Sequence, residues 1–505
     1  MKVPSLVGAL MLSACAVGPA YHVPAAPLPR AASYREAWKV ATPSDAMLRG
    51  KWWQTFHEPE LDALEARLEL DNQTIKQAFE TYMAARAQIR EARAGYFPTV
   101  TTVPSATVSR SSGTSSGFVT PTASGGPVAT AGGQMTPSMA PIATGGGGQR
   151  FTTYAAPLEA SWAPDLFGRV KNQVREAQYG AQVSAADLES QRLLEQATLA
   201  TTYFEIRGQD RLAVVLDATV ASDAEIASLT RTLFASGIGT EVAVVQAEQT
   251  LASARVQAIN VGVLRAQLEH AVATLLGVPA TDFSIPKRAA LAEPPQIPVG
   301  VPSRLLERRP DVAAAERQMA SSNALIGVGY AAYYPTLTLS ASAGFVSSAL
   351  STLFSWPSRV WSLGAQLSET LIDGGLRRAT IDQYVATYDA NVASYRQTVL
   401  TAFQQVEDGL SGLRILGQEI AEQKRMVALA ERAFVLEKAR YETGIDPYLD
   451  LMTQQTILLA AQQALLSLEV QDMTSAVSLV QALGGGWDWT ELPSPSAVSE
   501  RPGRR

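Results

Sequence analysis

The chain has 505 residues, 17% of them charged, and a formal net charge of -6 at pH 7. No block of Lys or Arg is long enough to attract nucleic acid, so we expect no nucleic-acid partner. The single cysteine, Cys15, excludes disulfides within the chain, and the three histidines are too far apart in sequence for a metal site, so we expect no metal and no cofactor.

The N-terminus has the pattern of a bacterial signal peptide. Lys2 precedes a short apolar run that ends in Leu12-Ser13-Ala14-Cys15, and this run is too short to span a bilayer. Its ending resembles the bacterial lipobox, in which small residues precede a cysteine that is diacylated and becomes the first mature residue. We expect residues 1–14 to be removed and Cys15 to carry lipid. The alternative is an ordinary signal peptide followed by an adventitious cysteine.

Residues 15–60 form the expected lipidated N-terminal segment. Beyond the signal peptide, no run of about 18 apolar residues predicts a membrane-spanning helix.

The rest of the chain consists of two similar repeats. Tyr96-Phe97-Pro98 matches Tyr333-Tyr334-Pro335 at an offset of 237 residues, and Gly237-Ile238 matches Gly444-Ile445 at an offset of 207. Two matched pairs with a consistent order indicate a true duplication. We therefore predict repeat one over 61–277 and repeat two over 303–487, joined by a Pro-rich linker over 278–302.

The change in offset is explained by an insertion in repeat one. Residues 111–148 are almost entirely Gly, Ser, Thr, Pro and Ala. This composition is typical of a flexible loop. We expect the loop to connect the first two strands.

Each repeat contains two segments in which apolar and polar residues alternate. They cover residues 154–162, 337–345 and 361–368, with a weaker match at 100–109. Alternating segments of about ten residues with aromatic residues at their ends are typical of a lipid-facing barrel, and a half-buried soluble sheet is the alternative. Because a bacterial barrel needs at least about eight strands, four strands must combine with those of other copies.

The remainder of each repeat is helix of unusual length. Residues 170–235 and 377–443 contain no proline and little glycine, and each span predicts a rod of about 100 Å. A glycine turn at Gly237 or Gly444 follows each rod, and return helices are predicted over 241–276 and 448–483. Each pair predicts an antiparallel helical hairpin. The tail over 488–505 is expected to be disordered.

No motif for catalysis occurs in the sequence. There is no Gly-rich phosphate loop, no zinc-binding helix and no nucleophilic serine in an elbow motif. We therefore expect that the protein is not an enzyme.

Several segments resemble those of the TolC-like outer-membrane factors. They include Cys15-Ala16-Val17-Gly18-Pro19, Glu307-Arg308-Arg309-Pro310-Asp311, Asp373-Gly374-Gly375 and Ala482-Leu483-Gly484-Gly485-Gly486-Trp487. Within this family, the chain is most similar to the NodT-type lipoproteins of resistance-nodulation-division efflux pumps. The long insertion departs from the short loop usual in the family.

The resemblance implies a mainly α fold with membrane β-strands. Each protomer would have two long helical hairpins and four strands. Three protomers would form a 12-stranded outer-membrane β-barrel continuous with a periplasmic α-helical tunnel. The homotrimer, lipid-anchored in the outer membrane of a Gram-negative bacterium, would export small toxic compounds or drugs. Its partners would be a periplasmic adaptor, an inner-membrane resistance-nodulation-division transporter and outer-membrane lipid.

The resemblance also implies a gate at the periplasmic tip of repeat two. Leu449 would form an apolar ring and Asp450 an acidic ring, while Tyr441 would help to hold the helices shut. Asp446 lies in the same turn. Thr453 stands where many relatives have a second acid, so the sequence does not decide whether a second acidic ring exists. The alternative is that Leu449 packs the hairpin and Asp450 is a first-turn acid favoured by the helix dipole.

The adaptor would contact the tips of both hairpins. The residues expected there are Gly237, Thr240 and Gly444. Two other functions remain open from the sequence: a type I secretion exit duct for polypeptides, and a periplasmic coiled-coil scaffold. The alternating strands argue against the scaffold, because a helical scaffold needs no strands.

Overall fold

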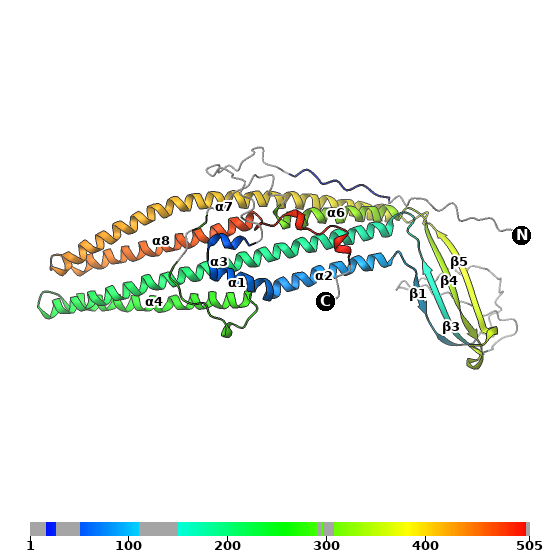
Figure 1. The fold of residues 1–505 in the computed structure, drawn as a ribbon, viewed down its shortest axis with the longest axis horizontal. Helices are drawn as coiled ribbons and strands as arrows, with labels where there is room; N and C mark the ends of the chain where they lie inside the picture. The colour runs from blue at the N-terminus through cyan, green and yellow to red at the C-terminus, as the bar shows by residue number, and fades with distance from the viewer. Residues whose placement is uncertain (1–16, 27–50, 111–149, 291–293, 296–307, 501–505) are drawn as a thin grey trace. The chain divides into compact units, whose positions relative to one another are not determined.

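The computed structural model describes residues 17–26, 51–110, 150–290, 294–295 and 308–500 (Figure 1). Cys15 and the insertion at 111–148 lie outside the described residues. The described chain divides into two compact units, a sheet unit from 93–170 and 332–375, and a helical unit from the rest.

The sheet unit contains the four predicted strands, the first of them in two pieces. The strands are β1 (Thr99–Thr102), β2 (Ser105–Arg110), β3 (Arg150–Trp162), β4 (Thr336–Ser347) and β5 (Arg359–Ser368). All pairs are antiparallel in the order β1-β3-β4-β5, and β2 also pairs with β3. The break between β1 and β2 contains Pro104, which has no backbone N–H to donate to the ladder.

One face of the sheet is apolar, as the alternation predicts. The strand register places Ala343 opposite both Leu158 and Trp361, so that equivalent positions gather on the same side. This apolar face contains Val100, Tyr154, Ala156, Leu158, Ala160, Trp162, Leu337, Leu339, Ala341, Ala343, Phe345, Trp361, Leu363, Ala365 and Leu367. On the opposite face, the hydroxyl oxygens of Ser342 and Ser362 lie 2.8 Å apart.

The helical unit is built from two long hairpins. Helices α3 (Arg169–Ala235) and α7 (Leu376–Glu442) have 67 residues each, and every bound of the hairpin helices lies within one residue of its prediction. The return helices are α4 (Glu241–Leu275) and α8 (Tyr448–Ala482). Shorter helices accompany them: α1 (Pro59–Asp71), α2 (Gln73–Ala94) and α6 (Pro310–Ala331). No described helix is both long and apolar enough to cross a membrane.

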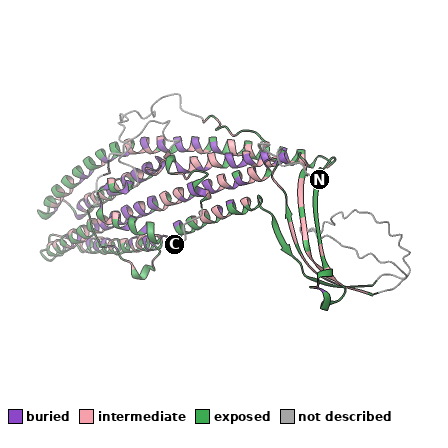
Figure 2. Ribbon diagram, turned by 45° about the vertical axis from the view of Figure 1, so that its right-hand side comes forward, coloured by how far each residue is buried: buried purple, intermediate pink, exposed green. Residues whose placement is uncertain are grey.

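The main core lies around the middle of the helical unit. The 3-10 helix Trp52–Phe56 inserts three aromatic residues there, and Phe56 lies 5.2 Å from Phe204 of α3 between ring centres. The same cluster includes Val399 and Val406 of α7 and Val477 of α8. Figure 2 shows that buried residues gather along the middle of the helices, whereas the tips of the hairpins are mostly exposed.

A buried charge cluster, which we call the Arg207 cluster, attaches the linker to this core. Arg207 and Arg265 both bind Asp210, at 2.9 Å and 2.6 Å. Arg207 also donates to the backbone carbonyl of Pro286 at 2.8 Å, and Arg265 donates to that of Ile285 at 2.7 Å. Because buried charges are costly unless paired and hydrogen-bonded, this cluster fixes α3, α4 and the linker together.

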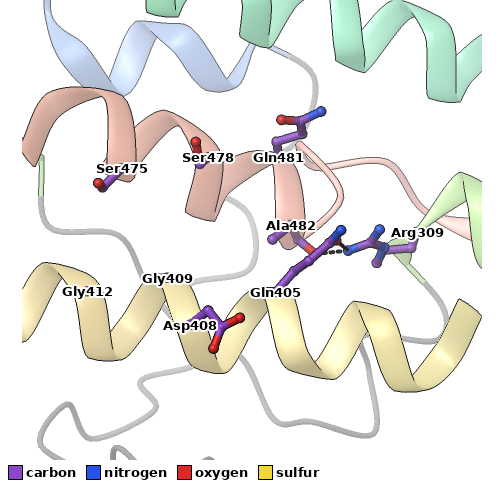
Figure 3. Close-up of a pocket in the computed structure, with 9 residues that line it drawn as sticks. All are labelled: Arg309, Gln405, Asp408, Gly409, Gly412, Ser475, Ser478, Gln481 and Ala482. Atoms are coloured by element: carbon purple, nitrogen blue, oxygen red, sulfur yellow. Dashed lines mark hydrogen bonds between the residues drawn. The ribbon is translucent and has the colours of Figure 1, made fainter. Parts of the chain in front are cut away.

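The Arg-Pro-Asp segment joins α6 to the end of the last long helix (Figure 3). Arg309 donates to the side chain of Gln405 at 2.7 Å and to the carbonyl of Ala482 at 3.0 Å, and it pairs with Asp311 at 2.6 Å. Arg309, Gln405 and Ala482 meet beside a polar cavity of about 430 Å³ between α7 and α8. Arg309 thus supplies a partner for a terminal carbonyl of α8 that the helix cannot satisfy itself.

The prediction of a disordered tail is wrong for residues 488–500. Two short 3-10 helices form there, Trp489–Glu491 and Ala497–Ser499. Val498 is buried against α2 and α3, and Arg86 donates to its carbonyl at 3.1 Å. The polar, Pro-containing composition indicated low helix propensity but did not reveal this docking contact.

Candidate gate at the tips of the helical hairpins

The two long helices end in the same capping motif. Gly237 and Gly444 have backbone φ angles of +81° and +73°. The amide of each glycine donates to the carbonyl three residues earlier, and the amide of the following Ile donates to the carbonyl five residues earlier. This is the Schellman motif, and glycine suits its left-handed position because it has no Cβ. The duplicated Gly-Ile pair therefore marks the helix end in both repeats.

The two tips lie side by side. A Cβ atom added to Gly444 would lie 3.8 Å from the Cγ2 atom of Ile238 in the other tip. Thr240 is exposed and caps α4, its hydroxyl accepting from the amide of Ala243 at 3.3 Å. The three residues predicted for adaptor contact thus belong to one neighbouring pair of exposed turns.

A small apolar cluster, the tip cluster, lies behind the turns. It draws residues from all four long helices: Ile226, Ala227, Ala247, Leu251, Tyr441, Tyr448 and Leu451. The rings of Tyr441 and Tyr448 lie 6.0 Å apart in an edge-on arrangement.

Both tyrosines also connect one hairpin to the other. The hydroxyl oxygen of Tyr441 in α7 lies 2.8 Å from that of Thr230 in α3. The hydroxyl of Tyr448 in α8 donates to that of Thr250 in α4 at 3.2 Å. Tyr441 thus contacts the other hairpin within one protomer, and its role in holding the helices shut stays a prediction.

A buried carboxyl makes a further connection between the hairpins. Asp223 of α3 accepts a hydrogen bond from the side-chain amide of Gln455 in α8, and both residues are buried. Burial raises the pKa of the Asp223 carboxyl to about 6, although the hydrogen bond from Gln455 acts in the opposite direction. At the surface, Lys438 pairs with Glu225 at 2.8 Å.

The remaining predicted gate residues are on the surface of the protomer. Leu449 is 56% exposed, and Asp450 and Thr453 are also exposed, in the first turns of α8. The hydroxyl of Thr453 donates to the carbonyl of Leu449 at 2.8 Å. Leu449 is thus not a packing residue of its own hairpin, and its apolar side chain is open to contact with other molecules.

The side chain of Asp446, in the turn before α8, has different partners from that of Asp450. It pairs with Arg440 at the end of α7, with a nitrogen–oxygen distance of 2.8 Å. The hydrogen bond from Arg440 lowers the pKa of this carboxyl. Asp446 therefore fastens the turn to α7, whereas Asp450 forms no side-chain ion pair with the residues that the structure describes.

The partners of these residues were not predicted from the sequence. Thr230, Thr250, Asp223 and Gln455 stand in helical segments without a local motif, and each contact joins residues about 200 positions apart. The only signal for Asp223 was an acid on a helix face that is otherwise rich in apolar residues.

Comparisons with known proteins give a consistent picture. The sequence pattern of the family described as "outer membrane efflux protein" matches residues 63–278 and 301–485. The solvent efflux pump outer membrane protein SrpC of Pseudomonas putida is 32% identical over 488 residues, which cover 95% of this chain and 97% of that protein. The antibiotic efflux pump outer membrane protein ArpC of Pseudomonas putida is 30% identical over 485 residues, covering 95% and 94%.

A solved structure agrees with these sequence matches. The outer-membrane channel OprN superposes with a TM-score of 0.76 at 27% identity, and the match covers 94% of this chain and 100% of that chain.

Proposed function

The chain belongs to the outer membrane efflux protein family, and from this premise we propose that three copies form an outer-membrane channel of a tripartite pump. The channel exports small toxic compounds or drugs. The observation that supports this proposal most directly is a sheet with one largely apolar face in the same chain as two 67-residue helices that end in exposed tips. Such a face suits lipid, and long paired helices suit a conduit beyond the membrane.

The sheet of one protomer needs neighbours on both sides. Among the described strands, β5 pairs only with β4, and β1 and β2 pair only with β3. Within lipid, unpaired backbone groups at such edges are costly, so the sheet has to close on itself. Four strands from each of three copies make a closed barrel of 12 strands, which exceeds the bacterial minimum of about eight.

The gate of this channel is formed by Leu449 and Asp450 of each copy. Three exposed leucines narrow the passage, and three carboxylates form an acidic ring beside them. The corresponding residues of repeat one are Val242 and Ala243, which bring no charge. Repulsion between like charges in a narrow neck strains the closed state, so an adaptor or a cation shifts it readily.

Planar-bilayer recordings of the trimer test this gate. Leu449→Ala should raise single-channel conductance, and Asp450→Asn should weaken block by divalent cations added on the periplasmic side. Val242→Ala is the matched control, because it shortens an exposed apolar side chain in the first turn of α4. Normal trimers with unchanged conductance and unchanged block would remove Leu449 and Asp450 from the gate.

We also propose that Gly237, Thr240 and Gly444 contact a periplasmic adaptor, which connects the channel to an inner-membrane resistance-nodulation-division transporter. The side-by-side position of the two exposed turns supports one docking area per protomer. Crosslinks from residues next to these turns to the adaptor would test it.

Lipid attachment at Cys15 is a further part of the proposal. Mass spectrometry of the mature N-terminus should find a diacylated cysteine, and Cys15→Ser should leave the chain unacylated. The variant should keep some channel function, since a closed barrel inserts by its own apolar band. An unmodified Cys15 in the native protein would refute the anchor.

A further inference from the structure

The sheet unit has an uneven distribution of charge. Residues 99–162 and 336–368, which form its strands and the connections between them, contain only four charged side chains: Arg110, Arg150, Glu159 and Arg359. These segments therefore carry a charge of +2 within a chain whose net charge is -6. All three arginines lie at strand ends, on the side of the sheet opposite to the strand ends that continue into helices.

All three arginines belong to the apolar side of the sheet. Arg110 is opposite Arg150 in the register of β2 and β3, and Arg150 is four residues before Tyr154 of the apolar face. Arg359 is opposite Phe345 and two residues before Trp361. Since alternate residues of a strand share a face, these arginines end the apolar face at its far side. All three are exposed.

The opposition of Arg110 and Arg150 favours the binding of an anion. Like charges directly across a strand pair are destabilising. The one acidic residue of 99–162 and 336–368 is Glu159, which lies on the opposite, polar face of the sheet. The same holds for a second copy, so the apolar face of a neighbouring sheet offers only more positive charge. A group that neutralises this pair would therefore come from another molecule.

Aromatic side chains accompany Arg359 at this end. Phe354 and Trp356 of the β4–β5 connection are 73% and 75% exposed. The guanidinium carbon of Arg359 lies 3.0 Å from the centre of the Trp356 ring, and its Nε donates to the Trp356 carbonyl at 3.3 Å. The Phe354 ring lies 5.5 Å from that of Phe345, on the apolar face. The apolar face thus continues into an aromatic and cationic border.

We propose that Arg110 and Arg150, and separately Arg359 with Phe354 and Trp356, form a border along the apolar face that binds phosphate-bearing lipids of the outer leaflet. We call it the lipid rim. Aromatic rings favour the boundary between hydrocarbon and headgroups, and arginine matches phosphate geometry with two parallel hydrogen bonds. The inference rests on the proposed function, because that function places the apolar face in the membrane and the helices in the periplasm.

The position of the arginines argues against a site for an exported anion. A passage through the closed sheet would be lined by the polar face, which carries Glu159, Ser342 and Ser362. The lipid rim belongs to the other face, next to exposed apolar side chains. A soluble anion gains nothing from those side chains, whereas a lipid contacts both parts of the rim.

Binding of lipid A to the detergent-solubilised trimer tests the inference, with native mass spectrometry as the measurement. The wild-type trimer should bind lipid A at least about tenfold more tightly than lipid A without its phosphates, since each arginine near a phosphate adds to the affinity. The variant with Arg110→Gln, Arg150→Gln and Arg359→Gln should lose this preference. A triple variant on the exposed surface of α7, with Arg396→Gln, Arg425→Gln and Arg432→Gln, should keep it.

Several outcomes would overturn the lipid rim. A wild-type trimer that shows no preference for the phosphorylated lipid would overturn it, whether or not the triple variant assembles. Full competition by inorganic phosphate at equal concentration would indicate a site for soluble anions instead. Channel recordings on the same preparations separate this inference from the proposed function, because a conducting trimer without lipid preference removes only the rim.

Discussion

The same long helices are held in two different ways along their length. At mid-length, α3 and α7 contribute to a large apolar core with the aromatic residues of the Trp52–Phe56 helix, and the Arg207 cluster adds paired, buried charges. At the tips, the tip cluster has seven buried residues, and single polar contacts join the hairpins.

This difference indicates where the helices can move. A large apolar core packs in few arrangements, so the mid-length region is expected to stay fixed. A small cluster with a few hydrogen bonds lies at the low end of local stability. We therefore expect that, if the tips form the proposed gate, they move while the middle of the same helices remains in place.

The largest expected effect comes from the Arg207 cluster. Arg207→Ala leaves Asp210 with a single cationic partner and removes the bond to the linker carbonyl, which should cost about 3–5 kcal/mol. The measurement is the thermal unfolding midpoint of the helical circular dichroism signal. Arg231→Ala is the control, because Arg231 lies on the same helix but is 57% exposed in its pair with Glu248, where about 1 kcal/mol or less is expected. Equal unfolding midpoints for the two variants would contradict the view that the mid-length region is held more firmly than the tips.

An intermediate effect is expected from pH. The carboxyl of Asp223 has a raised pKa of about 6 where it is buried in the tip, an arrangement that we take as the closed state, and an ordinary value near 4 once it is hydrated. The closed tip is therefore favoured at low pH, and it loses this advantage as the pH rises through the window from about 4 to about 6. Open probability should rise by up to about tenfold between pH 5 and pH 7.5.

The pH response has its own control in the chain. Asp223→Asn keeps a polar side chain next to Gln455 but does not titrate, so its channels should show a flatter pH profile. If wild-type and variant channels have identical profiles of open probability against pH over this range, the response belongs to other groups.

The smallest expected effect is that of a single hydroxyl at the tip. Tyr441→Phe removes the contact with Thr230 but keeps the ring in the tip cluster, and a hydrogen bond of this kind contributes about 1 kcal/mol. Open probability should rise by about fivefold in bilayer recordings, without a change in the unfolding midpoint. A lower midpoint with unchanged opening would mean that Tyr441 serves stability and not closure.

Much of the fold was accessible from the sequence because its signals are local. The absence of proline from 170–235 and the Gly-Ile pair at each tip defined the hairpins to within one residue. The alternation of apolar and polar residues defined the faces of β4 and β5, and the break at Pro104 explains why the first strand gave a weak match.

The contacts that define the site were not accessible, for a physical reason. The pairs Thr230–Tyr441 and Asp223–Gln455 form only because the two hairpins pack together, and a threonine or an acid on a helix gives no sign of its distant partner. The docking of Val498 against α2 and α3 was missed in the same way. Leu449 and Asp450 were identified only by resemblance, since their place in one protomer is an exposed helix turn.

The single-partner edges of the sheet have a consequence for how the protein reaches the membrane. A lone protomer entering hydrocarbon would carry the unpaired backbone groups of β1, β2 and β5 with it, at a cost of several kcal/mol for each group. If three copies close the sheet as proposed, we expect insertion and association to be one event in biogenesis, and a protomer that has not met two others to stay outside the bilayer. The rate of insertion should consequently rise steeply with protein concentration, with an order above one.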